Sequence, residues 1–396
     1  MIRPLRAALR LLVPLGIPLA WRQLADDKKR LVAALTGITF GIMLMLFQLG
    51  LYNGIMAMVV LPHTSLRGEL VMVSPNYEYF GSSLEFSRRR LYQARSLPEV
   101  ASTAPLYLGF LTWANPATGR VRTIFAMAIE PDENPFTIPE IRDHVAAIRD
   151  PESILFDTLS QDDYGPVPLL FRERGSVEAE AERKRVRVTG LYTLGHTLAA
   201  SADVILSDEG YFRLRPDKPR NMANVGMIQL KPGADADAVA RRLRALLPPD
   251  VEILPREVFV RNEQEYWAKR TPIGFVTVAG MLVGMLVGAI VVYQILYTDV
   301  NDHLHQYATL KAIGLGDGFF MGLVLQEAAI LVALSFLPAA LLTAVLNYQA
   351  HNAAHIPTEL SPRDLLTVLA AVAVMCLAAG LLATRKLRAA DPADVF

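Results

Sequence analysis

The chain has 396 residues, 52% of them hydrophobic and 20% charged, and its 39 basic and 39 acidic side chains leave no formal net charge. This balance argues against nucleic acid as a partner, and the apolar fraction indicates a membrane protein with a sizeable aqueous part. The single cysteine, Cys376, excludes an intramolecular disulfide.

The N-terminal residues 1–30 are basic and contain one short apolar stretch. Leu11 to Ala20 has the length of the hydrophobic region of a signal peptide, but prolines interrupt it and a second basic cluster follows. We therefore expect a cytoplasmic or interfacial segment, with a cleaved signal as the less favoured alternative. Residues 31–60 carry no charge and predict a first membrane span that extends into a stalk and ends at Pro62.

Residues 62–256 have the pattern of a soluble α+β domain. Two β-rich segments flank the turn residues Asn115 to Gly119, which is typical of a hairpin between 100–113 and 121–129. Further strands are expected at 68–74, 153–157, 185–193, 202–207, 225–230 and 251–254, and helices at 84–95 and 234–247. The β-α-β patterns at the two ends of the domain predict two related lobes.

Three more apolar segments follow a polar stalk helix predicted at 257–270. Their composition predicts spans at 272–298, 319–347 and 365–384, with a short outer link at 348–364 and a tail at 385–396. The fold class expected from the sequence is thus an α-helical membrane protein with four transmembrane helices and a large α+β extracytoplasmic domain inserted between helices 1 and 2.

Basic residues lie next to the first and the last span. The cluster Lys28-Lys29-Arg30 precedes the first span, and Arg385, Lys386 and Arg388 follow the fourth. Basic flanks stay in the cytoplasm, so both termini and the link at 299–318 are predicted to be cytoplasmic.

The link at 299–318 has the composition of a short helix. Val300, Leu304 and Tyr307 are spaced i, i+4 and i+7 with polar residues on the other faces, and glycine is absent until Gly314. A short ordered helix between two spans is predicted to contact a partner.

Two features of the spans concern packing. The second span carries a stripe of glycines that would let a neighbouring helix approach closely, with ordinary glycine usage as the alternative: Gly280, Gly284 and Gly288. The intramembrane polar residue Glu327 lies in the third span, where an ionised carboxylate is costly. A structural role for it, with Gln294, Gln48 or water as partner, is favoured over a functional one.

Three short motifs point to chemistry or binding, but each is better explained otherwise. Gly190 to Thr197 has the frame of a phosphate-binding loop, yet His196 stands where the lysine must be. The run Arg88 to Arg90 could meet a lipid headgroup, although a solvated helix face is favoured. Three residues have the spacing of metal ligands, in a segment that Pro357 interrupts: His351, His355 and Glu359. We therefore predict no catalytic residue, no metal site and no cofactor.

Several longer stretches resemble a known family. They are FSRRRLYQA at 86–94, LFDTLSQDDYGPV at 155–167, YWAKRTPIGF at 266–275, VVYQILYTDVNDHLHQYATLKAIG at 291–314, QEAAIL at 326–331 and RKLRAADPADVF at 385–396. With the order of one span, a large domain and three spans, the chain resembles the MacB/FtsX-type permeases of ABC transporters, and among them the DevC group of DevBCA-like exporters. Ser87 and His305-Gln306 depart from the family pattern, which puts partner affinity in question.

The resemblance implies a dimeric permease in the bacterial inner membrane that works with a separate DevA-like cytoplasmic ATPase, which binds the ATP. It also implies a DevB-like periplasmic adaptor, a TolC-like outer-membrane duct and export of glycolipid or other envelope material, driven by motion that the stalk transmits. We assign the ATPase contact to six residues of the link: Asp299, Asp302, His303, Leu304, Tyr307 and Lys311.

Three alternatives remain open at this point. An FtsX-like transmitter would use the same motion to activate an envelope hydrolase, and a LolC/LolE-like permease would release lipoproteins. A membrane-bound enzyme would depend on the histidine spacing near His351.

Overall fold

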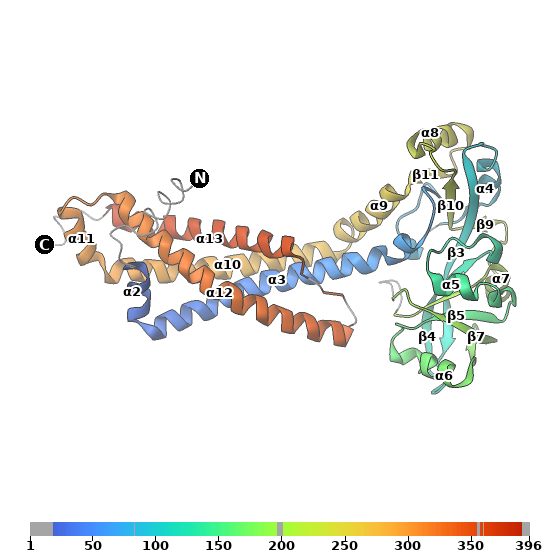
Figure 1. Ribbon diagram of the computed structural model, residues 1–396, viewed down its shortest axis with the longest axis horizontal. Coiled ribbons are helices and arrows are strands. Elements are labelled where there is room, and N and C mark those ends of the chain that lie inside the picture. Colours follow the sequence, from blue (N-terminus) through green and yellow to red (C-terminus); the bar gives the residue numbers. More distant parts are fainter. Residues whose placement is uncertain (1–18, 83, 196–200, 355–356, 359, 390–396) are drawn as a thin grey trace. The chain divides into compact units, whose positions relative to one another are not determined.

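The computed structural model describes residues 19–82, 84–195, 201–354, 357–358 and 360–389, and the predictions for a signal peptide and for the last tail residues lie outside them. The chain divides into two compact units. We call residues 1–54 with 272–396 the helical unit, and residues 55–271 the α+β domain. Figure 1 shows the elements of both.

The helical unit is built from the long helices of the chain. The helices are α2 (Leu19–Asp26), α3 (Lys28–Ser65), α10 (Pro272–Asp302), α11 (Leu304–Ala312), α12 (Asp317–Ala354) and α13 (Pro362–Ala389). Four of these described helices, α3, α10, α12 and α13, are long and apolar enough to cross a membrane, which confirms the predicted spans. At 38 residues, α3 is roughly 57 Å long and exceeds a hydrocarbon core.

Two predicted helix ends are wrong. The first long helix passes through Pro62 and ends at Ser65. A proline removes only one backbone donor, and the Ser65 hydroxyl, which donates to the Pro62 carbonyl at 2.7 Å, supports the last turn. The link also begins later than predicted, because α10 continues to Asp302 and only α11 forms the short separate helix.

The α+β domain is organised around one nine-stranded sheet. Its strand order is β11-β1-β10-β3-β4-β8-β5-β7-β6. The strands are β1 (Leu70–Val73), β3 (Val100–Ala114), β4 (Val121–Ile129), β5 (Ser153–Asp157), β6 (Val177–Ala181), β7 (Lys184–Tyr192), β8 (Asp203–Ser207), β10 (Val225–Leu230) and β11 (Glu252–Pro255), and β2 (Phe86–Ser87) pairs separately with β9 (Met222–Ala223). The predicted hairpin is confirmed, since β3 and β4 pair antiparallel from Leu106↔Ile129 to Ala114↔Val121.

The expectation of two lobes, one at each end of the domain sequence, is wrong. The first strand, β1, pairs with both late strands, β10 and β11, so the two ends of the domain share one half of the sheet. The middle strands β4 to β8 form the other half of the same continuous sheet.

Both faces of the sheet are covered. In β1, Leu70 and Met72 belong to one buried cluster, while Val71 and Val73 belong to another, as alternation along a strand requires. The helices of the domain are α4 (Arg89–Ala94), α5 (Pro139–His144), α6 (Val167–Arg174), α7 (Asp208–Leu214), α8 (Ala236–Leu246) and α9 (Arg256–Lys269). The predicted helix at 84–95 is shorter than expected because Phe86 and Ser87 pair as a strand with β9.

Candidate functional site

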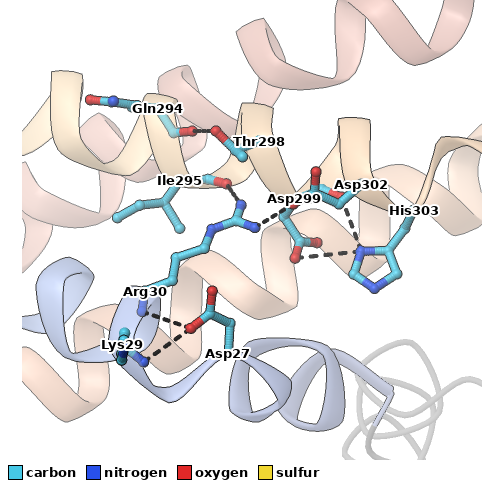
Figure 2. A network of polar contacts seen from close by, with 9 residues as sticks. All are labelled: Asp27, Lys29, Arg30, Gln294, Ile295, Thr298, Asp299, Asp302 and His303. Carbon is cyan, nitrogen blue, oxygen red and sulfur yellow. Dashed lines mark hydrogen bonds and ion pairs between the residues drawn. The ribbon is translucent and has the colours of Figure 1, made fainter.

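Three of the predicted contact residues, Asp299, Asp302 and His303, lie at or just after the end of α10, beside the start of α3 (Figure 2), and the other three lie in α11. Asp299 and Asp302 lie on the last turn of α10, and His303 lies at the junction. Leu304, Tyr307 and Lys311 belong to α11, but the side chains of Leu304 and Lys311 lie outside the described ones.

Arg30 joins the start of α3 to the end of α10. Its guanidinium lies 2.8 Å from an Asp302 carboxylate oxygen and donates to the Ile295 carbonyl at 2.6 Å (Figure 2). Asp27 caps the same helix start, because its side chain accepts from the backbone N–H groups of Lys29 and Arg30. The two helix ends are therefore held together by charge-assisted bonds.

Asp299 points into the helical unit rather than out of it. Its side chain lies 3.6 Å from His303 Nδ1, and it also faces Glu327 on α12. Both acids are buried, with 3% of Asp299 and none of Glu327 exposed. This burial argues against the predicted contact of Asp299 with a partner.

Tyr307 anchors α11 to its neighbours. The side chain is only 2% exposed, its hydroxyl accepts from Gln23 Nε2 at 3.1 Å, and its ring lies 5.3 Å from that of Phe320. Burial raises the pKa of the Tyr307 phenol well above its ordinary value, so the hydroxyl stays protonated. Within this chain Tyr307 holds the helix in place and does not present a surface to a partner.

The outward face of this link is formed by other residues. His305, Gln306 and Thr309 of α11 are exposed, and Ile313, just after the helix, is 76% exposed. The sequence pattern missed this face because the i, i+4, i+7 spacing marks the apolar side of a helix without showing whether it packs inward or outward.

A polar cavity of about 270 Å³ lies beside the same residues. Its lining includes Gln23, Asp27, Arg30, Asp299 and His303, from α2, α3 and α10. The cavity is confined to the helical unit and is flanked by the buried acids.

The three predicted packing glycines face helices of the same chain. A Cβ at Gly284 would lie 3.1 Å from the Gly41 carbonyl oxygen, and one at Gly288 would lie 2.9 Å from Met375 Sδ. A Cβ at Gly280 would collide with Gln48. The close approach therefore joins α10 to α3 and α13, and packing between two copies stays a prediction.

The two glutamines suggested as partners of Glu327 are wrong. Among the described residues, neither carboxylate oxygen of Glu327 has a hydrogen-bond partner, and Gln48 lies against Gly280. Glu327 instead faces Asp299, because α12 packs beside the end of α10.

Three other motifs have clear positions or fall outside the described residues. Gly190 lies near the end of β7, so the first residues of this motif belong to a strand, while His196 and Thr197 lie outside the described part. Among the residues that the structure describes, no group of three possible ligands is placed to hold a metal ion. His355 and Glu359 lie outside them. In the arginine run, Arg88 pairs with Glu130 and Arg90 with Asp250.

The α+β domain contains a buried glutamate that the sequence analysis missed. Glu263 of α9 is 2% exposed and accepts from the Tyr77 hydroxyl at 2.8 Å, the Phe80 backbone N–H at 3.0 Å and the Trp267 indole at 3.0 Å. His63, near the end of α3, also lies close, with its Nε2 atom 3.3 Å from Glu263 Oε2. Burial and the charge of Glu263 raise the pKa of Tyr77, which keeps this donor protonated.

Two family models match the chain. The model described as MacB-like periplasmic core domain matches residues 31–246, more than half of the chain, and the model described as FtsX-like permease C-terminal matches residues 278–392. No curated protein sequence matches.

Solved structures give weaker likenesses. The periplasmic region of MacB from Actinobacillus actinomycetemcomitans is 8% identical with a TM-score of 0.35, and the match covers 50% of this chain and 94% of that one. The extracellular domain of the noncanonic ABC-type transporter YknZ from Gram-positive bacteria is 10% identical with a TM-score of 0.31, covering 47% of this chain and 98% of that one. A domain of a putative permease protein from Porphyromonas gingivalis is 14% identical with a TM-score of 0.29, and the match covers 48% of this chain and 88% of that one. Because these TM-scores are low, the family rests on the two models.

Proposed function

The chain belongs to the family of proteins with a MacB-like periplasmic core domain, and from this premise we propose that it is the permease subunit of a DevC-type, tripartite ABC efflux system. The family consists of transmembrane components of ABC systems and implies an ABC ATPase as partner. The α+β domain between the first and second long helices is the MacB-like domain, and the FtsX-like match covers most of the other three long helices.

The observation that carries the proposal is the link at α11. A nine-residue helix is fixed between two spans by the buried Tyr307, while His305, Gln306, Thr309 and Ile313 face outward. An exposed isoleucine just after a helix held by its own chain, beside polar side chains, is suited to docking on a rigid partner. We assign this face to the cytoplasmic, DevA-like ATPase, which binds the ATP.

The remaining steps of the mechanism follow from this docking. ATP binding draws the permease ends of a homodimer together, and the long α3 and the α9 segment carry the motion to the MacB-like domain. That domain engages a DevB-like adaptor, which joins a TolC-like duct and exports glycolipid or other envelope material. The basic flanks Lys28 to Arg30 support cytoplasmic termini in the bacterial inner membrane.

Co-purification tests the docking face. Ile313→Glu in the full-length protein should reduce recovery of the ATPase from membranes by at least tenfold, because a carboxylate would be buried in the contact. Val121→Glu is the matched control, since Val121 is 65% exposed and lies in the α+β domain. Equal recovery of the ATPase with both variants would contradict the assignment.

A second candidate function has one observation in its favour, the match of residues 278–392 to an FtsX-like model. In that case the chain would transmit motion to an envelope hydrolase and export nothing. Affinity purification of the native complex separates the two, because an adaptor and bound lipid support export, whereas a co-purifying peptidoglycan hydrolase supports signalling.

A further inference from the structure

Buried oxygen atoms without a hydrogen-bond donor gather between α2, α10 and α12. They are both carboxylate oxygens of Glu327, Oδ2 of Asp299 and Oε1 of Gln23. Tyr307 connects them, because its hydroxyl is bonded to Gln23 and lies in the field of both acids. All the orphaned atoms are acceptors, and buried polar atoms rarely lack a partner, so the missing component is a donor.

The charges around the two acids do not balance. Arg30 from α3 is engaged by Asp302 and the Ile295 carbonyl, and His303 lies beside Asp299. In the described part of the chain no ion pair includes Glu327, although none of its surface is exposed. A carboxylate without a counter-charge in such a place is costly, and a second carboxylate facing it adds repulsion.

We propose that Glu327 carries a proton and donates it to Asp299, so that the two side chains form a proton-binding site between α12 and α10. A single proton on a Glu327 oxygen turns that acceptor into a donor and satisfies Asp299 Oδ2, with no covalent bond broken. The groups that face the pair are Arg30 from α3, Asp302 and His303 from α10, Tyr307 from α11 and Gln23 from α2.

The site lies where the chain turns between two spans. Loss of the proton leaves two negative charges facing each other, and the cheapest relief is separation of α10 from α12, the helices that α11 connects. The proton therefore holds α10 and α12 together at the turn that α11 forms between them. The inference rests on the buried acids and holds whether or not the chain exports a substrate.

Infrared difference spectroscopy tests the site in the full-length protein, reconstituted in lipid nanodiscs. The wild type should show the carbonyl stretch of a protonated carboxylic acid at neutral pH, and titration to alkaline pH should abolish it. Glu327→Gln should remove the band, and Asp299→Asn should shift its frequency because the acceptor changes from a carboxylate to an amide. Asp26→Asn, at an exposed carboxylate lining the same cavity, should leave the band unchanged.

Three results would overturn the proposal. The first is the absence of such a band in the wild type at neutral pH, and the second is a band that persists in Glu327→Gln. The third is a melting temperature that rises with added Na⁺ or K⁺ in the wild type but not in Glu327→Gln, which would assign the site to a metal cation. If Glu327→Gln does not fold, Asp299→Asn provides the test instead. A carbonyl band whose frequency is the same in Asp299→Asn as in the wild type contradicts the proposal.

Discussion

Among the residues that the structure describes, each unit buries one glutamate, and the surroundings of the two glutamates are opposite in character. In the α+β domain, Glu263 is surrounded by donors: the Tyr77 hydroxyl, the Phe80 N–H and the Trp267 indole. In the helical unit, neither oxygen of Glu327 has a hydrogen-bond partner among the described residues, and the side chain that it faces is another acid, Asp299. A ring of donors stabilises a carboxylate, whereas an acid facing an acid is stable only with a proton between them.

The difference shows that burial alone does not define the role of an acidic residue. Glu263 connects α9 to His63 near the end of α3 and to the segment that holds Tyr77, so its charge is used to fasten parts of one domain. Glu327 fastens α12 to α10 only while it is protonated. The first connection is permanent, and the second can be released.

Glu263→Ala should lower the free energy of unfolding the most. Removing the carboxylate leaves the donors of Tyr77, Phe80 and Trp267 without their acceptor and His63 without its neighbouring charge, at a cost of about 3–5 kcal/mol in the free energy of unfolding. Urea unfolding of the full-length protein, followed by circular dichroism, measures it. Glu263→Gln should cost less, about 1.5–3 kcal/mol. Glu265→Gln, at the exposed neighbouring acid, is the control, and equal losses at positions 263 and 265 would refute the account.

Gly284→Leu should cause the second-largest loss in the free energy of unfolding. Its side chain would meet the Gly41 carbonyl and Met45 at 3.1 Å, which costs about 1–3 kcal/mol by overpacking α3 against α10. Thermal unfolding in nanodiscs measures the loss. Gly322→Leu is the matched control because a Cβ there meets nothing within 4 Å. Loss of a crosslinked dimer at an unchanged melting temperature would instead place Gly284 between two copies.

Glu327→Gln should have a smaller effect, below about 1 kcal/mol, because the amide can donate to Asp299 as the protonated acid does. The direct comparison is with Glu263→Gln, measured by the same urea unfolding. If Glu327→Gln lowered the free energy of unfolding as much as Glu263→Gln does, the two glutamates would not differ in the way described.

Asp217→Asn should have the smallest effect, a few tenths of a kcal/mol, since its ion pair with Arg215 is exposed and screened. The Arg215 hydrogen bond lowers the pKa of Asp217 from 3.8 to about 2. A lowered folded-state pKa gives stability that is present above 3.8 and is lost as the pH falls through 2. The wild type should therefore be more stable than the variant by a few tenths of a kcal/mol at neutral pH, and the difference should disappear as the pH falls from about 4 to about 2. A difference above about 1 kcal/mol at neutral pH, or one that persists below pH 2, would contradict this.

Much of the fold could be predicted because its signals are local. The uncharged runs mark the spans, and the turn at Asn115 to Gly119 marks the β3–β4 hairpin. Strand β6 was missed because it is only five residues long and, from Val177 to Ala181, consists mostly of alanine and glutamate, which are uncommon in strands. The pairing of β1 with β11 joins segments far apart in the chain, which no local pattern encodes.

The site was predicted only in part for the same reason. The spacing of Val300, Leu304 and Tyr307 located the short helix, but the burial of Tyr307 depends on Gln23 and Phe320 from distant elements. Glu327 was singled out by its position in an apolar run, whereas its partner Asp299 follows from how α10 packs beside α12.

The pairing of β1 with β11 has a consequence for how the α+β domain can be exchanged. Leu70 and Pro255 are cross-strand partners, so the chain enters and leaves the sheet at directly opposite residues. A segment whose ends meet in this way can be cut out and its ends joined by a short turn, or replaced by another domain with neighbouring ends, without stretching the flanking chain. An exchange of the whole domain should nevertheless include residues 55–271, because Glu263 and His63 lie outside the segment from Leu70 to Pro255 and Glu263 bonds to Tyr77 within it.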